Sequence, residues 1–432
     1  MLAALPAASL AAWTARQRWY AGPAVTGPAA VVAARPFTAA GDGVLATVRL
    51  GPTDDTYLLP LGVGHPAGLP AEALVAVIDG VAVYDALHDP RLVTALLTRA
   101  APAVAAALGE APAVRPLGVE QSNSSVVIDE RYVLKVFRRQ TAGPNRDLTV
   151  HRALVEAGCP NVKPLLGAVE DAASGTTHAT LQEYLPDAVD GWALALEHAR
   201  TFGDLRAEAG ALGAAVAAVH RGLATAGGER PLTAADFGRL SEGFLARLDR
   251  ALAVAPRLAR HAARLRAEFR AVARPLWGPG PAAAAGGPAA QLIHGDLHLG
   301  QALRTGDDWL VIDFEGEPLA TPAERDRPDS PLRDLAGMLR SFDYAAHHRA
   351  GDDRRGLARA ARWAGHHQRA FLAGYAAAAG GAGRDAERWL LTAYVLDKAV
   401  YEVAYEVQHR PDWAWLPARA LDRLLTGTAE AA

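Results

Sequence analysis

The fold of this chain is decided by the stretch Gln291-Leu-Ile-His294-Gly-Asp296-Leu-His298-Leu-Gly-Gln301, which is followed by Trp309-Leu-Val-Ile312-Asp313-Phe-Glu315. A glycine-containing loop carries one carboxylate, an amide follows five residues later, and a second carboxylate ends an apolar strand twelve residues after the amide. The spacing predicts that three oxygen-bearing side chains converge. Magnesium prefers oxygen ligands and retains several waters, so a carboxylate and an amide suffice as its protein contacts. The alternative is an ordinary hairpin in which Asp296 is a turn residue.

This spacing is typical of phosphoryl transfer, in which a protein orients the attacking hydroxyl and neutralises the charge of the transferred group. It has the form of the kinase catalytic loop, H-x-D-x-x-x-x-N followed by D-F-G, with Gln301 in place of Asn and Glu315 in place of Gly. We predict that Asp296 is the base that accepts the proton of the hydroxyl. Gln301 and Asp313 are predicted to bind Mg²⁺, with Glu315 as an additional candidate ligand.

Bulk properties exclude several classes of protein. A length of 432 residues predicts two or three domains. The net charge of −3 gives no general polyanion-binding surface, so nucleic acid is not an expected partner. The single cysteine, Cys159, excludes an internal disulfide framework and fits a reducing compartment. The apolar opening has no basic leader, and no uninterrupted apolar run reaches about 18 residues, so we expect no membrane span and a cytoplasmic location.

A lysine inside a strand marks the expected nucleotide-binding region. Residues 1–90 read as a helix followed by short antiparallel strands, and residues 91–185 as a helix followed by further strands. Lys135 interrupts the apolar segment Tyr132-Val-Leu-Lys-Val-Phe, where a charge needs a partner. An ATP phosphate would be such a partner, whereas the alternative is a solvent-facing lysine on an edge strand. A carboxylate of the next helix is expected to pair with it, either Asp147 or Glu156.

Two further segments are expected to contact the nucleotide. The polar turn before the lysine strand lacks glycines, so its backbone amides and hydroxyls would meet the phosphates; the hydroxyls are those of Ser122, Ser124 and Ser125. The end of a later strand precedes Pro186-Asp187 and is the expected hinge into a second lobe. Adenine would be held there largely by backbone groups of Gln182, Glu183, Tyr184 and Leu185.

Residues 186–432 are mostly helical by apolar spacing. Arg333 and Asp334, at the start of one helix, are predicted to brace the catalytic loop, whereas His220 is predicted to be a satisfied capping residue. One face of a late helix gathers Lys398, Tyr401, Glu402, Tyr405 and Glu406. This face suits a polyhydroxyl ligand, to which Trp413 would add stacking surface. The alternative is a solvated face on which Lys398 and Glu402 form a helical ion pair.

Taken together, these motifs resemble those of the actinobacterial maltokinase-type sugar kinases, which are relatives of the aminoglycoside phosphotransferases. The motifs that carry the resemblance are Gln17-Arg-Trp-Tyr-Ala-Gly22, His294 to Gln301, Val311-Ile-Asp-Phe-Glu-Gly-Glu-Pro318, Ser330-Pro-Leu-Arg-Asp334, Ser341-Phe-Asp-Tyr344, Tyr401-Glu-Val-Ala-Tyr-Glu406 and Arg410-Pro-Asp-Trp413. The resemblance implies an α+β, protein-kinase-like bilobal fold. Its parts would be an N-terminal cap subdomain (1–90), a β-rich nucleotide-binding intermediate subdomain (91–185) and an α-helical C-lobe with the catalytic loop and sugar site (186–432).

The family's functional residues carry over by position. The resemblance implies ATP and Mg²⁺ as cofactors, with Lys135 on phosphate, Gln301 and Asp313 on magnesium, and Asp296 and His298 at a small-molecule sugar. Three departures bear on this transfer: Leu292 stands where maltokinases commonly have Arg, Thr149 stands where they usually have Glu, and the tail reads Ala414-Trp-Leu-Pro417.

The altered tail resembles a branch that phosphorylates glucosamine at the 6-hydroxyl, so glucosamine is the expected substrate. The alternative substrate is maltose, giving maltose 1-phosphate. A catalytically silent sugar-binding or regulatory protein is a different class, against which the retained Lys135, Asp296, Gln301 and Asp313 argue. Aminoglycoside modification is a further alternative, which would appear as resistance in cells that express the protein.

Overall fold

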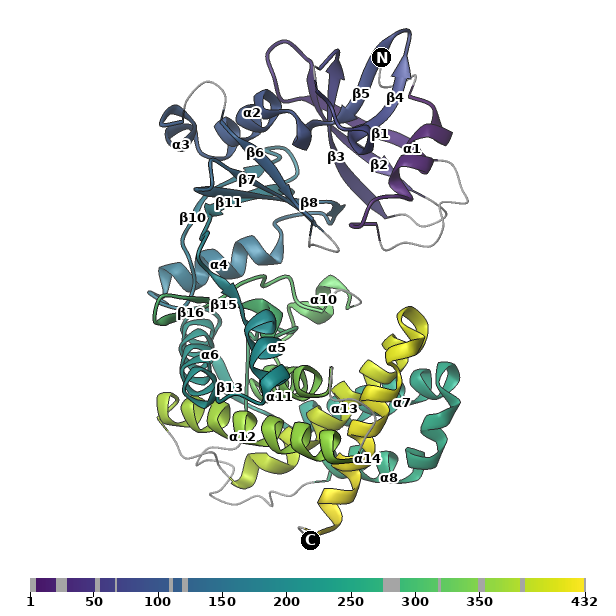
Figure 1. Cartoon of the computed structure of the whole chain (residues 1–432), viewed down its shortest axis with the longest axis vertical. Helices are drawn as coiled ribbons and strands as arrows, with labels where there is room; N and C mark the ends of the chain where they lie inside the picture. The colour runs from purple at the N-terminus through teal and green to yellow at the C-terminus, as the bar shows by residue number, and fades with distance from the viewer. Residues whose placement is uncertain are drawn as a thin grey trace. The chain divides into compact units, whose positions relative to one another are not determined.

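The computed structural model describes residues 5–20, 29–50, 55–66, 68–108, 112–118, 123–274, 288–317, 320–348, 354–380 and 385–430. The chain divides into two compact units (Figure 1). Unit 1 comprises Met1–Arg152 and Lys163–Asp187, and unit 2 comprises Ala153–Val162 and Ala188–Ala432. Within the described ranges, no helix combines the length and the apolar character that crossing a lipid bilayer requires.

The first part of unit 1 is a six-stranded antiparallel sheet. Its main path runs β1-β2-β3-β5-β4, and β9 pairs with β3. The strands are β1 (Ala30–Pro36), β2 (Gly43–Arg49), β3 (Thr56–Gly64), β4 (Leu74–Ile78), β5 (Val81–Asp85) and β9 (Arg139–Gln140). The two residues between β4 and β5, Asp79 and Gly80, have φ of +50° and +82°. Such positive φ values at both turn positions are what a two-residue hairpin requires. Helix α1 (Ala7–Thr14) packs beside β4.

The second part of unit 1 is a five-stranded antiparallel sheet in the order β10-β11-β8-β7-β6. Its strands are β6 (Val114–Leu117), β7 (Asn123–Ile128), β8 (Tyr132–Phe137), β10 (Leu165–Glu170) and β11 (Thr177–Glu183). The accompanying helices are α2 (Pro90–Ala100), α3 (Pro102–Ala106) and α4 (Arg146–Glu156), with short 3-10 turns at Ala71–Ala73 and Ala86–His88. Asp89 caps α2 by accepting a hydrogen bond from the backbone N–H of Arg91.

One hydrophobic core joins the two sheets of unit 1. It gathers buried side chains from before residue 90 and after it, among them Phe37, Leu58, Val126, Leu134 and Leu181. The ranges 1–90 and 91–185, which the sequence predicts as separate subdomains, therefore share this core.

A buried ion pair accompanies this core. The guanidinium of Arg138 donates to Asp85 over 2.6 Å, and both side chains are almost fully buried. Since a buried charge is costly unless it is paired, this contact fastens β5 to the chain that follows β8.

Unit 2 is mainly helical (Figure 1). Its longer helices are α5 (Gly191–Thr201), α6 (Arg206–Gly227), α7 (Ala234–Val254), α8 (Ala259–Val272), α11 (Leu332–His347), α12 (Arg354–Ala378), α13 (Asp385–His409) and α14 (Trp415–Glu430). Helix α12 packs along α6, while α11 packs between α12 and α13. The shorter elements are α10 (Pro322–Arg325) and the 3-10 turns Pro256–Leu258, Leu299–Gln301 and Pro411–Trp413.

Two small antiparallel sheets carry the catalytic-loop segment. One pairs β13 (Glu229–Pro231) with β14 (Ala289–Gln291), and the other has the order β12-β15-β16, from Val189–Asp190, Ala302–Thr305 and Asp308–Val311. The loop that carries Asp296 begins where β14 ends, and Asp313 follows β16 by two residues. The apolar hairpin expected from the sequence is thus present.

Candidate active site

The loop between β14 and the turn at Leu299–Gln301 is held in shape by backbone geometry. Gly295 has φ of +90°, a conformation that glycine adopts without a steric penalty. The imidazole of His294 accepts a hydrogen bond from the backbone N–H of Asp296 through Nδ1, over 3.3 Å. Its Nε2 therefore carries the hydrogen and donates to the carbonyl of Ile312, over 3.0 Å. His294 thus ties the loop to the end of β16.

A buried carboxylate of α11 accepts hydrogen bonds from the same loop. Asp334 accepts hydrogen bonds from the backbone N–H groups of His294 and Gly295, at 2.7 and 2.8 Å. It also accepts one from Nε2 of His220 at 3.0 Å, while Nδ1 of His220 accepts from the hydroxyl of Tyr375. Burial raises the pKa of Asp334, but these donors and the nearby imidazoles outweigh it and hold that pKa below its usual value.

The bracing role expected of Asp334 is therefore present, but Arg333 does something else. Arg333 pairs with Glu317 at 2.8 Å and with Asp329 at 3.3 Å. The expectation for His220 is wrong, because it lies within α6 and supports Asp334 instead of capping a helix end. The sequence carried no signal for this pair, whose members are 114 residues apart.

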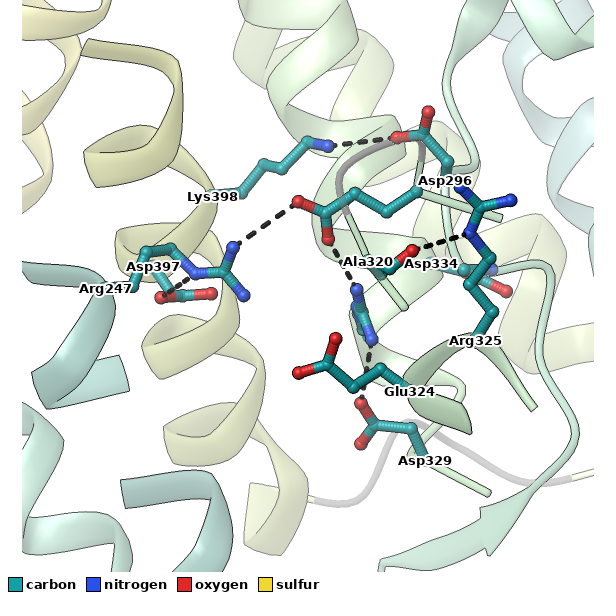
Figure 2. A network of polar contacts seen from close by, with 12 residues as sticks. Arg247, Asp296, Ala320, Glu324, Arg325, Asp329, Asp334, Asp397 and Lys398 are labelled. Carbon is teal, nitrogen blue, oxygen red and sulfur yellow. Dashed lines mark hydrogen bonds and ion pairs between the residues drawn. The ribbon is translucent and has the colours of Figure 1, made fainter. Parts of the chain in front are cut away.

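The predicted base meets a cation from the late helix. Lys398 of α13 lies with its Nζ 3.1 Å from Oδ1 of Asp296, and Figure 2 shows the two side chains pointing toward one another. Burial opposes ionisation of Asp296, but Lys398, followed by His298 and His294, outweighs it and lowers the pKa of this carboxyl. Burial also opposes the charge on Lys398, yet Asp296 and its neighbours raise the pKa of the ammonium. The helical ion pair considered for Lys398 and Glu402 is replaced by this long-range pair.

His298 follows the base by two residues. Its Nδ1 accepts a hydrogen bond from the backbone N–H of Gly300 over 3.1 Å, so its Nε2 carries the hydrogen when the ring is neutral. Burial lowers the pKa of His298 although Asp296 acts in the opposite direction. A neutral ring with one available donor suits an acceptor oxygen of a sugar.

The two predicted metal ligands adjoin one another. Nε2 of Gln301 donates to Oδ2 of Asp313 over 3.0 Å, and Asp313 has φ of +65°. A half-turn of the amide would present its oxygen to the side on which the carboxylate lies. With the amide so turned, one carboxylate and one amide oxygen would form the hard, oxygen-only donor set that Mg²⁺ prefers, so these residues fit the cation. Glu315 follows two residues later, and its backbone carbonyl accepts from Arg325 over 3.4 Å.

A pocket with about 400 Å³ of empty space, part of it open to solvent, lies beside the base. Its lining comes from the catalytic loop, the segment after β16, and helices α7, α11 and α13. It consists of Arg247, Gly295, Asp296, Leu297, Glu317, Arg333, Asp334, Gly337, Tyr394, Asp397, Lys398 and Tyr401. Four carboxylates against three cations leave this lining with one formal negative charge.

Ion pairs hold the wall of the pocket (Figure 2). Arg247 of α7 donates to Asp397 over 2.9 Å and to Glu317 over 3.4 Å, and Arg333 donates to the other oxygen of Glu317. The guanidinium of Arg247 also lies 5.8 Å from the ring centroid of Tyr401. Helices far apart in the sequence are thereby fixed around the base. Sequence reasoning missed Arg247 and Asp397, which lie in no recognisable motif. It also gave no role to Glu317, although this residue belongs to the motif of residues 311–318.

Only part of the predicted sugar-binding face of α13 lines the pocket. Tyr401 lines the pocket, and its ring stacks on that of Tyr405, with centroids 6.1 Å apart. Glu402 accepts two hydrogen bonds from Arg340, at 2.9 and 2.7 Å, both on Oε2. Its side chain remains 12% exposed, and Oε1 accepts no hydrogen bond from the part of the chain that the structure describes.

The last predicted sugar contacts lie outside the pocket lining. Glu406 is buried and accepts from the hydroxyl of Tyr344 and from Arg410, at 3.2 and 2.7 Å. Trp413 packs edge-on against His348, with ring centroids 4.7 Å apart. A role for Glu402, Tyr405, Glu406 or Trp413 in sugar binding stays a prediction.

In unit 1 the strand lysine has an acidic partner. Nζ of Lys135 lies 3.1 Å from Oδ2 of Asp147, which is buried at the start of α4. Glu156, the other candidate, is exposed at the end of that helix. The hydroxyl of Thr149 bonds to the backbone of its own helix. The acidic partner of Lys135 is therefore Asp147, two residues before Thr149, which was the position noted in the sequence as a departure from Glu.

The serines of the predicted phosphate-binding turn differ in their surroundings. Ser124 accepts a hydrogen bond from Nε of Arg138 over 2.8 Å, and the same guanidinium bonds to Asp85. Ser125 is buried and stands opposite Lys135 in the pairing of β7 with β8. Ser122 lies outside the described residues. Ser124 is therefore fastened to the first sheet, and its contact with phosphate stays a prediction.

The segment predicted to hold adenine, Gln182 to Leu185, ends β11. Gln182 and Glu183 pair with β8, and the N–H of Tyr184 donates to the carbonyl of Arg131 over 2.8 Å. The carboxylate of Glu183 pairs with Lys163 over 2.7 Å. An adenine contact by backbone groups of Gln182, Glu183, Tyr184 or Leu185 stays a prediction.

These features define the class of protein. The chain belongs to the phosphotransferase enzyme family, whose model matches residues 113–390. The model of the maltokinase N-terminal cap domain matches residues 13–89. The predictions of a maltokinase-like relationship and of a phosphotransferase with an alcohol group as acceptor are confirmed.

Three similar proteins are glucosamine kinases. The glucosamine kinase of Streptacidiphilus jiangxiensis is 30% identical over 417 residues, covering 87% of this chain and 92% of that protein. The glucosamine kinase of Mycolicibacterium smegmatis is 31% identical over 333 residues, covering 72% and 79%. A solved structure of glucosamine kinase in complex with glucosamine, ADP and inorganic phosphate has a TM-score of 0.68 at 24% identity, covering 98% of each chain. This likeness confirms the predicted kinase-like fold.

Proposed function

We propose that this protein is an ATP- and magnesium-dependent glucosamine kinase that transfers the γ-phosphoryl group to the 6-hydroxyl of the sugar. One observation carries the proposal: an ionised carboxylate, Asp296, lies on a pocket whose lining has one net negative charge. Such a lining suits a small acceptor that bears one positive charge, as an amino sugar does. Two relatives about 30% identical are glucosamine kinases, which supports the same substrate.

Asp296 has the role of base in this proposal. Its Oδ1 is occupied by Lys398, whereas Oδ2 accepts no hydrogen bond from the described residues and is available to the acceptor hydroxyl. The low pKa of the carboxyl means that the base is in its proton-accepting form at neutral pH. Because Asp334 and His294 immobilise the loop, the carboxylate is oriented before the substrate arrives, which lowers the entropy cost of reaching a reactive geometry.

The other groups bind the second substrate. Gln301 and Asp313 would hold Mg²⁺, which when bound neutralises the charge on the phosphates of ATP. Lys135, kept in place by Asp147, would contact a phosphate. Glu402 is outside the pocket lining but on the same helix as Lys398 and Tyr401, and Arg340 engages only its Oε2. We assign Glu402 to the ammonium of glucosamine, whose attraction to a partly buried carboxylate exceeds its value in water.

Maltose is the second candidate substrate, because the chain carries the maltokinase N-terminal cap domain. A catalytically silent protein is disfavoured by the intact set of base, metal ligands and lysine. The deciding experiment offers glucosamine, glucose, N-acetylglucosamine, maltose and an aminoglycoside at equal concentration with ATP and Mg²⁺, and measures ADP release and the phosphorylated product. Turnover that depends on glucosamine supports the proposal. Preference for maltose would overturn the substrate, and the absence of sugar-dependent turnover would overturn the activity.

A further inference from the structure

Lys398 occupies a position that the catalytic loop alone does not explain. It comes from α13, 102 residues after the base in the chain, and its ammonium contacts Oδ1 of Asp296 over 3.1 Å. Both side chains line the pocket. The ammonium also lies 5.0 Å from the ring centroid of Tyr401, within the range of a cation–π contact. A fixed cation therefore stands at the place where an acceptor must approach the base.

We propose that Lys398 is a positioning residue that determines which end of an amino sugar faces the base. Its contact directs one carboxylate oxygen away from the substrate, so that the other oxygen receives the hydroxyl. Its charge repels the ammonium of the sugar from the same spot. The inference rests on the proposed glucosamine kinase function and adds an account of how the enzyme orients its substrate.

The charges around Asp296 make this orientation necessary. An ionised carboxylate in a partly buried pocket attracts any ammonium, and the attraction at contact distance is stronger than in water. Glucosamine could then bind with its amine against the base and its 6-hydroxyl elsewhere, which is unproductive. Lys398 already occupies Oδ1, one of the two oxygens that such an ammonium could contact. Repulsion between the ammonium of Lys398 and that of the sugar disfavours the unproductive pose. A neutral hydroxyl is therefore the group that binds next to the carboxylate.

The remaining acidic groups of the wall are engaged in pairs of their own. Asp397 accepts from Arg247, and Glu317 accepts from Arg247 and Arg333. Without Lys398, Asp296 would be the carboxylate of the pocket with the most exposed and least neutralised charge. The sequence of α13 offers no second lysine to replace it, because the chain has only Lys135, Lys163 and Lys398.

The test compares Lys398→Met, which removes the charge, with Lys398→Arg, which keeps it. Arg266→Met is the matched control, because it breaks a surface pair with Asp249 in unit 2 and leaves the pocket lining unchanged. Each variant is assayed for kcat and KM with glucosamine, and binding of glucosamine and of neutral glucose is measured by calorimetry. Circular dichroism and melting temperature report whether each variant is folded.

We expect Lys398→Met to lower kcat by about 10- to 100-fold, as displacement of a catalytic group does. We expect its KM for glucosamine to fall as well, since an unproductive pose lowers both constants. Its preference for binding glucosamine over glucose should rise about tenfold. Lys398→Arg should keep kcat within about tenfold of the wild type and leave that preference unchanged.

Two results obtained with a folded Lys398→Met variant would overturn the inference. One is a kcat of Lys398→Met close to that of Arg266→Met. The other is an equal loss of kcat in both Lys398 variants with an unchanged binding preference, which is what a merely structural lysine would give. If Lys398→Met does not fold, a binding preference in Lys398→Arg that differs from the wild type also overturns it. A wild-type protein that does not phosphorylate glucosamine refutes the proposed function itself, and this is seen before any variant is made.

Discussion

Replacing Asp334 with asparagine tests whether the buried carboxylate organises the catalytic loop. Asp334 is 1% exposed and accepts three hydrogen bonds, two from loop N–H groups and one from His220. Asparagine has one acceptor oxygen and one NH₂ group, so at least one of these donors would face another donor. Because Oδ2 accepts two of the bonds, we expect the NH₂ group to replace Oδ1 and to oppose the N–H of Gly295.

The magnitude follows from these contacts. A hydrogen bond to a charged group contributes about 1.5–3 kcal/mol, and a buried donor left unpaired costs about 1–3 kcal/mol. We therefore expect Asp334→Asn to lower the free energy of unfolding by about 3 kcal/mol. The loop would also shift, and a displacement of about 1 Å at a catalytic group lowers turnover by about 100-fold.

The assay combines urea unfolding with kcat measured on the folded variant. Asp249→Asn is the control, because Asp249 is an exposed partner of Arg266, and such surface pairs contribute at most about 1 kcal/mol. An Asp334→Asn variant whose unfolding free energy and kcat both match those of the control would refute the role of Asp334.

The same pair of proteins gives a pH dependence of defined sign. The pKa of Asp334 is lowered in the folded state, so its contribution is complete above the unfolded value of about 3.9 and is lost as the pH falls through the folded pKa. The difference in unfolding free energy between wild type and Asp334→Asn should therefore stay constant from about pH 8 to 5 and shrink below about pH 4. A difference that grows on acidification would contradict the lowered pKa.

The remaining predictions concern the groups that bind and transfer phosphate. Asp296→Asn should lower kcat by orders of magnitude while the affinity for nucleotide, measured by calorimetry, stays near that of the wild type; near-normal turnover would refute the role of base. Lys135→Met should weaken ATP binding more than sugar binding, and Asp147→Asn should do so less strongly; equal losses for both ligands would argue for a folding defect. Asp313→Asn should raise the Mg²⁺ concentration needed for half-maximal rate, which a magnesium titration measures, and an unchanged requirement would remove Asp313 from the metal site.

Local patterns predicted much of the molecule because they have local causes. The alternation of residues 44–50 and 132–137 gave β2 and β8, and the spacing from His294 to Asp313 gave the loop and hairpin that carry the base. The expected bracing by Asp334 is also present, since a carboxylate at the start of an apolar helix needs buried donors. Family resemblance supplied the fold class, which no periodicity could give.

The partners that cross the molecule were not predictable in this way. Lys398 has Glu402 four residues away, a spacing that favours a local ion pair, yet its partner is Asp296. The sequence likewise predicted a local role for His220, as a capping residue, but His220 contacts Asp334. The placement of α6, α11 and α13 around the loop decides both contacts, and a single sequence does not encode that placement in any motif.

The two sheets of unit 1 (Figure 1) share one hydrophobic core. A shortened protein that started near residue 91 would lose Phe37 and Leu58 from this core and would deprive Arg138 of Asp85. The cap is therefore an internal support for the strand that carries Lys135. The residues after 90 should therefore not fold stably without the cap. A shortened protein would expose apolar surface and would be expected to aggregate.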